Sequence, residues 1–331
     1  MTTHVAVPIP VEALALPALM TALPFPPDCH PVAVYLARLG PSSRRPMAAA
    51  LQTAARILTR GQLTADAVPW HRLAHPHLVA LRSELAQAYA PSTGNRILTA
   101  VRSVLQECWE LGYMSSEDQR RASTIQPIRG HRLPKGRMLS GDELGRLFHV
   151  CAADHHPAGR RDAAMLAVLY GTGPRRSELV NLDLADYDPT MEALTVRAGK
   201  GNKDRLLLLN PVCTQAVRQW LTVRGPEAGP LFGPLSKRGC LVGRRLSDKA
   251  VTWILSVRAS QAGVAAFSPH DLRRTFISSL LDASVDLVTV ADMAGHSNIS
   301  TTAKYDRRGE TAKRKAAALL TVPFVPMARA S

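Results

Sequence analysis

The sequence of 331 residues is 46% hydrophobic and 20% charged, which gives it enough apolar side chains for folded cores and excludes a disordered chain or a fibre. At about 100–200 residues per domain, it is long enough for two domains or three small ones. Lys and Arg outnumber Asp and Glu by 41 to 26, a formal net charge of +15 that residues 1–137 and 138–331 share almost equally. A merely basic surface is one interpretation, but two cationic halves favour a long polyanionic partner, with nucleic acid as the natural candidate.

Residues 1–29 are rich in proline and are predicted to be a flexible N-terminal extension without a core of its own. No Lys or Arg precedes Arg38, and prolines interrupt the apolar stretch, which argues against a signal peptide or a membrane helix. The five cysteines show no CxxC or Cys/His ligand spacing, so we expect neither a zinc site nor a disulfide framework. These features predict a protein of the reducing cytoplasm with no membrane segment.

Residues 30–125 are predicted to form a small helical domain. Apolar residues recur at helical spacing in four segments, which are PVAVYLARL, MAAALQTAARIL, HPHLVALRSELAQAYA and NRILTAVRSVLQECWELGY. Ser42 and Ser43 are candidate caps for the second helix, and the fourth follows Pro91.

The periodicity is lost between Ser115 and Met138, where Pro, Gly and basic residues are frequent and apolar ones are few. This composition predicts an exposed basic linker. We assign the linker itself to residues 126–137 and place the domain boundary near residues 130–138.

Residues 138–331 are predicted to form a second domain of mixed structure. Ser140 stands three residues before Glu143, the spacing of a capping box at the start of a helix. Two β-rich runs flank the turn-rich string GKGNKD and predict a hairpin. Further helices are expected at RRDAAMLAVLYGTG, RSELVNL, VCTQAVRQWL, SDKAVTWILSVRASQAG, HDLRRTFISSLLDAS, DLVTVADMAG and GETAKRKAAALL. The predicted fold class is mainly α with a small antiparallel β-sheet in this second domain (α+β).

Five short strings in the second domain combine basic, histidine and tyrosine residues. Each alone is weak, because a lone Arg is usually a solvated charge and a lone His or Tyr usually packs in a core. Their joint order is more informative. The strings are TGPRRSEL (172–179), GKGNKDR (199–205), HDLRR (270–274), GH (295–296) and TTAKY (301–305).

In the order and spacing of these strings, the chain closely resembles the tyrosine recombinases, the family of phage-type integrases and Xer proteins, over roughly residues 30–320. Their catalytic domain carries an Arg, a Lys, a His-x-x-Arg pair, a His and a Tyr in this order. In this chain Tyr305 stands nine residues after His296, which is the family's usual separation. Arg274 occupies a position where many relatives have His, and we do not expect it to be catalytic. The resemblance implies six catalytic residues, Arg175, Lys200, His270, Arg273, His296 and Tyr305.

The chemistry of these residue types fits strand cleavage without water or ATP. A tyrosine can conserve the phosphodiester energy as a phosphotyrosine, so Tyr305 is the expected nucleophile. Arg175 and Arg273 offer planar donors for the charge of a phosphorane, and Lys200 can protonate the leaving 5′ oxygen. The two histidines are expected to assist proton transfer and hold the phosphate. No cofactor is expected, and the nearby acidic residues form no paired cluster for metal ions.

The resemblance also implies the partners and the overall arrangement. A SAM-like helical domain and the catalytic domain are expected to form a C-shaped clamp around duplex DNA. We expect Arg96, Arg102, Lys203 and Arg205 to contact the DNA. The chain is expected to be a monomer or weak dimer when free, a homo-tetramer on two DNA sites, and associated with the nucleoid. Whether an unidentified directionality or accessory protein also takes part stays open.

Two other functions remain as alternatives. The chain could be a DNA-binding clamp that has lost strand cleavage, although every expected catalytic position is filled. It could also relax supercoils as a type IB topoisomerase does, since that class shares the chemistry. The sequence reveals neither the DNA site nor the choice among integration, excision and dimer resolution.

Overall fold

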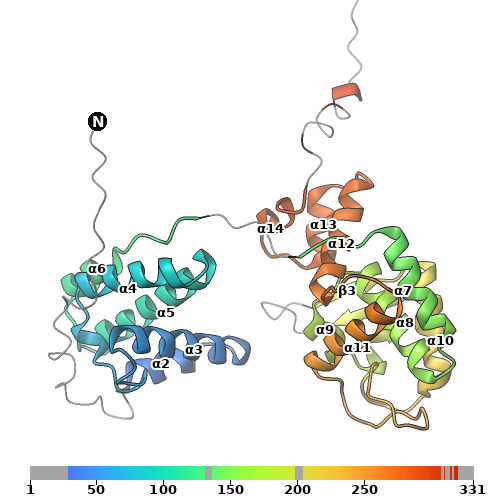
Figure 1. Ribbon diagram of the computed structural model, residues 1–331, viewed down its shortest axis with the longest axis horizontal. Helices are drawn as coiled ribbons and strands as arrows, with labels where there is room; N and C mark the ends of the chain where they lie inside the picture. Colours follow the sequence, from blue (N-terminus) through green and yellow to red (C-terminus); the bar gives the residue numbers. More distant parts are fainter. Residues whose placement is uncertain are drawn as a thin grey trace, which may run out of the picture. The chain divides into compact units, whose positions relative to one another are not determined.

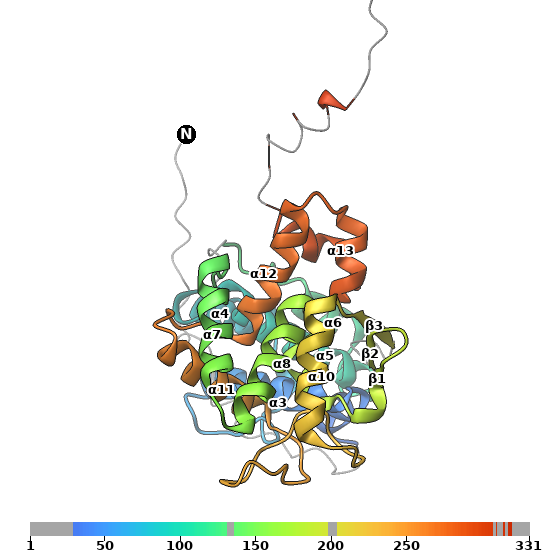
Figure 2. The same cartoon turned by 90° about the vertical axis from the view of Figure 1, so that its right-hand side faces the viewer.

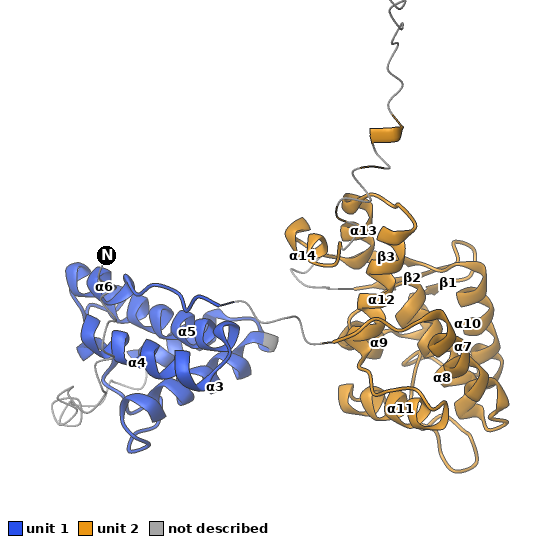
Figure 3. Cartoon of the chain, turned by 45° about the horizontal axis from the view of Figure 1, so that its top comes forward, with its two compact units in different colours: residues 1–134 blue, residues 135–331 orange. Residues whose placement is uncertain are grey.

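The computed structural model describes residues 29–130, 136–197 and 204–306, together with residues 309, 314 and 317–319. The chain divides into two compact units, unit 1 with residues 1–134 and unit 2 with residues 135–331 (Figure 3). Lys200 and Lys203 lie outside the described residues, as does most of the predicted helix GETAKRKAAALL.

Unit 1 is a helical domain whose apolar faces meet in one core. Leu51 and Leu58 pack there with Trp70 and with residues of two later helices, such as Leu81 and Val104. The elements are α2 (Pro31–Arg38), α3 (Pro41–Leu58), the 3₁₀ helix η3 (Trp70–Arg72), α4 (His75–Ala88), α5 (Pro91–Glu110) and α6 (Ser116–Ser123), and Figure 1 labels the α-helices among them.

Helix α3 begins earlier than predicted. Gly40 is its N-cap and Pro41 its first residue, so Ser43 lies inside the first turn and the expected caps Ser42 and Ser43 were wrong. Proline is favoured at the first helical position because its missing N–H would have no partner there, and its φ angle already suits the helix. Helices α2 and α5 begin at a proline in the same way.

The prediction of an exposed linker from Ser115 onward was also wrong in its first part. Residues Ser116–Ser123 form α6, and the Ser115 side chain caps it by accepting a hydrogen bond from the N–H of Asp118 at 3.1 Å. Only Ala122 of this short helix is buried, so no apolar period was visible in the sequence. Ile125 and Ile128 then pack into the unit 1 core.

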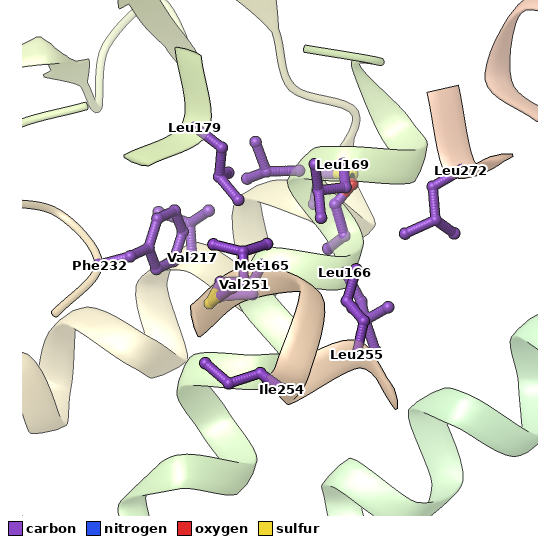
Figure 4. Packing of buried hydrophobic residues seen from close by; sticks show 14 of the residues in the cluster. Met165, Leu166, Leu169, Leu179, Val217, Phe232, Val251, Ile254, Leu255 and Leu272 are labelled. Atoms are coloured by element: carbon purple, nitrogen blue, oxygen red, sulfur yellow. Dashed lines mark hydrogen bonds between the residues drawn. The ribbon is translucent and has the colours of Figure 1, made fainter. Parts of the chain in front are cut away.

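Unit 2 is built around α8, which lies between α7 and α10 (Figure 2). Figure 4 shows its core, where Met165, Leu166 and Leu169 meet side chains of other elements such as Phe232 and Leu255. Its helices are α7 (Gly141–Ala153), α8 (Pro157–Gly171), α9 (Arg176–Asn181), η4 (Leu184–Asp186), α10 (Pro211–Arg224), α11 (Asp248–Gln261), α12 (Pro269–Asp282), α13 (Leu287–Ala294) and α14 (Ile299–Ala303).

The capping box predicted at the start of α7 is confirmed. The N–H of Glu143 donates to the Ser140 hydroxyl at 3.2 Å, and the N–H of Ser140 donates to the Glu143 carboxylate at 2.9 Å.

The described part of unit 2 contains one antiparallel sheet in the order β1 (Tyr187–Asp188), β2 (Ala193–Val196) and β3 (Arg205–Leu208). Strands β2 and β3 are the two predicted runs on either side of GKGNKD, and Val196 pairs with Arg205. The predicted fold class, mainly helical with a small antiparallel sheet in the second domain, is confirmed. No helix in the described part of the chain is long and apolar enough to span a membrane.

Candidate active site

Helix α12 carries His270 and Arg273 in its first turns, and its start is firmly held. The Asp271 carboxylate caps the helix by accepting hydrogen bonds from the backbone N–H and the hydroxyl of Ser268, each at 2.8 Å. Its other oxygen accepts a hydrogen bond from the N–H of Arg137 at 3.0 Å. These bonds fix the end of the helix from which His270 and Arg273 extend.

Arg175 follows a turn that requires glycine. Gly173 has a φ angle of +60°, and a Cβ atom there would lie 2.2 Å from the ring of Phe276. The turn also presents the Gly173 carbonyl to Arg273, whose Nη1 donates to it at 2.6 Å. The string TGPRRSEL therefore contacts the helix that carries HDLRR.

Glu178 joins the first arginine to the hairpin. Its carboxylate accepts hydrogen bonds from the N–H and Nη1 of Arg175 at 2.6 and 2.7 Å. It also accepts a bidentate pair from Nη1 and Nη2 of Arg205 at 2.9 and 2.7 Å. Burial raises the pKa of Glu178, but the hydrogen bonds from Arg205 and Arg175 outweigh this effect and lower the pKa to about 2. The carboxylate is therefore ionised at neutral pH and ties α9 to β3.

Gly295, the C-cap of α13, joins the string that contains His296 to Arg175. It has a φ angle of +65°, and its carbonyl accepts a hydrogen bond from Nη2 of Arg175 at 2.8 Å. A Cβ atom at this position would lie 2.8 Å from Nε of Arg205. Both the backbone conformation and the close approach of Arg205 explain why glycine precedes His296.

Tyr305 lies beside both predicted histidines. Its hydroxyl is 3.4 Å from Nε2 of His270, and its ring stacks with that of His296 at a centroid distance of 6.3 Å and an interplanar angle of 17°. Nδ1 of His296 is 2.7 Å from the hydroxyl of Thr302 in α14. The geometry thus brings together five of the six predicted catalytic residues, and the sixth, Lys200, lies outside the described residues.

The arginines make the site electropositive. Arg273 is only 3% exposed, and burial followed by the charge of Arg175 lowers its pKa to about 10. Burial and the charges of Arg273 and Arg175 lower the pKa of His296 to about 4. The pKa of His270 is also lowered, by burial and then by the charges of Arg274 and Arg273. Both imidazoles are therefore neutral at pH 7.

A pocket of about 320 Å³ opens beside these groups, and Arg175, His270 and Arg273 are among its lining residues. Two guanidiniums and a neutral imidazole suit a phosphate group, because they offer several N–H donors and a positive field. Within the described ranges, no group of three or more His, Cys, Asp or Glu residues is arranged to hold a metal ion.

The residues expected to contact DNA have different surroundings. Arg96 on α5 is exposed, whereas Arg102 on the same helix donates to the carbonyl of Ile125 and so holds the end of unit 1. Arg205 forms a salt bridge with Glu178, and its side chain is 14% exposed. Lys203 lies outside the described residues.

Sequence reasoning missed two participants. Glu178 was seen only as part of a motif, although its spacing of three from Arg175 across a helix start could have indicated a contact. Arg274 was set aside, yet its guanidinium lies over the ring of Tyr305, with Cζ 5.2 Å from the centroid. No local pattern predicts that contact.

Comparisons with known proteins identify relatives of this chain. The sequence model described as the phage integrase family matches residues 137–311. Tyrosine recombinase XerC of Staphylococcus carnosus is 36% identical over 181 residues, which are 53% of this chain and 58% of that protein. The chain thus spans little more than half the length of that relative. XerC of Alcanivorax borkumensis is 32% identical over 257 residues, 76% of this chain and 80% of that protein.

A solved structure of the Tn1549 transposon integrase, in complex with transposon right end DNA, shares the fold. Its TM-score is 0.66 at 15% identity, and the match covers 88% of this chain and 98% of that one.

Proposed function

The chain belongs to the phage integrase family, and we propose on this basis that it is a site-specific DNA recombinase. It cleaves and rejoins strands through a covalent 3′-phosphotyrosyl intermediate. The observation that carries the proposal is the position of Tyr305, whose hydroxyl lies 3.4 Å from His270, a lining residue of the pocket that Arg175 and Arg273 also line. A nucleophile beside a neutral base and two phosphate-binding arginines suits phosphoryl transfer.

In the cleavage step, the oxygen of Tyr305 attacks the phosphorus and the bond to the 5′ oxygen of the next nucleotide breaks. Because the lowered pKa of His270 keeps it neutral, its Nε2 can accept the phenolic proton in the tautomer protonated on Nδ1. The departing 5′ oxygen takes a proton from Lys200, as the resemblance of the hairpin implies. A 5′ hydroxyl of another strand reverses these steps and rejoins the DNA.

Arg175 and Arg273 stabilise the charge that gathers on the non-bridging oxygens. Arg175 uses one N–H of each terminal nitrogen for Glu178 and Gly295, and each of these nitrogens has a second N–H for the phosphate. Neutral His296 donates a further hydrogen bond. Arg205 acts indirectly, because it holds the Glu178 carboxylate against Arg175.

We further propose double-stranded DNA as the partner and a homo-tetramer on two DNA sites as the active assembly. The formal net charge of +15 supports a polyanionic ligand, and the similar Tn1549 integrase was solved with DNA. In this proposal the helical residues 30–125 and the catalytic residues 138–331 grip the duplex together. The protein acts in the cytoplasm, on the nucleoid.

A non-catalytic clamp and a type IB topoisomerase are the competing functions. The neutral His270 beside Tyr305 favours a working nucleophile over a lost one. Relatedness to XerC recombinases favours strand exchange over relaxation. A topoisomerase would relax supercoiled plasmid of any sequence, whereas a recombinase cleaves only its own site.

The test is an SDS gel of the protein after incubation with nicked duplexes drawn from the DNA that flanks its own gene. We expect an SDS-resistant adduct on one duplex, and none with Tyr305→Phe, which should still bind that duplex. An adduct formed by Tyr305→Phe would assign the nucleophile elsewhere. Specific binding without any adduct would favour the non-catalytic clamp.

A further inference from the structure

Arg274 has a position unlike that of its neighbour Arg273. Arg273 lines the pocket, whereas Arg274 places its guanidinium over the ring of Tyr305, with 5.2 Å from Cζ to the ring centroid. Arg274 is only 6% exposed, so this cation is largely removed from water. A desolvated guanidinium within about 6 Å of an aromatic centroid attracts the ring through its electron-rich face.

The guanidinium lies close to the segment that enters unit 2. Gly136 has a φ angle of +110°, and a Cβ atom there would lie 3.4 Å from Nε and 3.5 Å from Nη2 of Arg274. The same Cβ atom would clash with the Asp271 carboxylate at 2.4 Å. The next residue, Arg137, donates its N–H to that carboxylate at 3.0 Å. A side chain at position 136 would therefore meet both Asp271 and Arg274, and glycine leaves the room that the guanidinium occupies.

Tyr305 lies just after a short helix, so contacts of its side chain are needed to fix its position. It follows α14, a helix of only five residues that ends at Ala303, and its N–H donates to the carbonyl of Thr302 at 2.9 Å. Its side chain is partly buried and packs against the small cluster that includes Phe276 and Met293. A nucleophile on so short an element needs a partner from a rigid helix to hold its ring in line with the phosphate.

We propose that Arg274 is a positioning residue for the nucleophile of the recombinase reaction. It holds the ring of Tyr305 through its positive charge, an inference that rests on the proposed function of Tyr305. As the phenolic oxygen gives up its proton and attacks, the ring becomes richer in electrons and the attraction to Arg274 increases. The contact therefore promotes cleavage and leaves the affinity for DNA unchanged.

The test compares Arg274→Gln, which removes the charge, with Arg274→Lys, which keeps it. Arg160→Gln, an exposed arginine of α8 in the same unit, is the matched control. Each protein carries 3-fluorotyrosine at position 305, so that a ¹⁹F spectrum of the free, full-length chain reports the surroundings of the ring. Cleavage is measured as the single-turnover rate of adduct formation on the nicked duplex that the wild type cleaves, and DNA affinity by gel shift.

We expect Arg274→Gln to move the ¹⁹F resonance and to slow adduct formation about tenfold, with DNA affinity within about twofold of the wild type. Arg274→Lys should recover most of the rate, and Arg160→Gln should change neither quantity. An unchanged resonance and rate in Arg274→Gln would overturn the proposal, as would an equal loss in the lysine variant. If the wild type itself forms no adduct, the proposed function fails instead, and the ¹⁹F spectra still decide whether Arg274 holds the ring.

Discussion

Two networks of arginines in the described part of unit 2, the balanced and the unbalanced network, differ in how their charges are paired. In the first, Arg161 and Arg258 face Asp162 and Asp154, so two cations meet two carboxylates. In the second, Arg175 and Arg205 share Glu178, while Arg273 donates to the carbonyl of Gly173.

The pKa values follow this difference. Burial lowers the pKa of Arg258, but hydrogen bonds and charges from Asp154 and Asp162 outweigh it and raise the pKa above its usual value. Burial and the charge of Arg175 lower the pKa of Arg273 to about 10. The first network supports the fold and is complete within the chain. The second holds positive charge that is not matched by carboxylates in the described residues, which is what a site for an external phosphate requires.

The largest expected effect is on catalysis at the unbalanced network. Arg273→Lys and Arg175→Lys keep the charge but lose the planar pair of donors, so each should slow adduct formation by roughly 10²–10³-fold. The rate on the nicked duplex, measured with saturating protein, checks this. Wild-type rates in either variant would remove that arginine from phosphate binding.

A substitution in the balanced network should lower the stability of unit 2. Arg258→Met leaves the Asp162 and Asp154 carboxylates short of a cation and should destabilise unit 2 by about 3 kcal/mol. Arg273→Met, the matched variant from the same unit, should cost less than about 1 kcal/mol, because it also relieves repulsion from Arg175. Native-state hydrogen exchange in α8 measures both. Equal losses would show that the two networks do not differ in this way.

Glu178 should make the stability of unit 2 depend on pH, with a loss of stability in acid. Its pKa is depressed from 4.5 to about 2 in the folded chain, so its contribution is fully present above pH 4.5 and is lost as the pH falls toward 2. Glu178→Gln should therefore reduce the unfolding free energy by about 2–3 kcal/mol at pH 7 and by much less near pH 2. Hydrogen exchange in α9 at both pH values tests this, and a difference independent of pH would contradict it.

The smallest effect is a shift in the titration of His296. Because burial and then the charges of Arg273 and Arg175 lower its pKa to about 4, an anion between these arginines should raise that pKa. An NMR titration with and without sulfate should show a rise of about one pH unit. In Arg273→Met the pKa should be higher without sulfate and should move less when sulfate is added. If sulfate leaves the pKa of His296 unchanged in the wild type, no anion binds between these arginines.

Local chemistry explains which parts of the fold were predictable. The capping box of Ser140 and Glu143 involves residues three apart, and the hairpin strands are separated only by their turn, so both are visible in the sequence. Helix α6 was missed because its stability comes from a cap and from charges near its ends, with a single buried residue to mark it.

The site was predictable as a set of residues but not as a network. The order of the motifs identified the residues now found around Tyr305 and the pocket. The pairing of Glu178 with Arg205 joins residues 27 apart in the chain, and the contact of Arg274 with Tyr305 joins a helix to a distant turn. Such pairings depend on how α9, β3 and α12 pack, and a single sequence carries no signal of them.

In the proposed reaction, Tyr305 attacks a phosphate bound by Arg175 and Arg273 of the unbalanced network. The most direct measurement is mass spectrometry of the protein–DNA adduct. The protein is first digested with a protease and the DNA is trimmed to a single nucleotide, and the modified peptide is then sequenced. We expect a nucleotide joined through its 3′ phosphate to the peptide that contains Tyr305. A nucleotide on any other residue, or one joined through its 5′ phosphate, would contradict it.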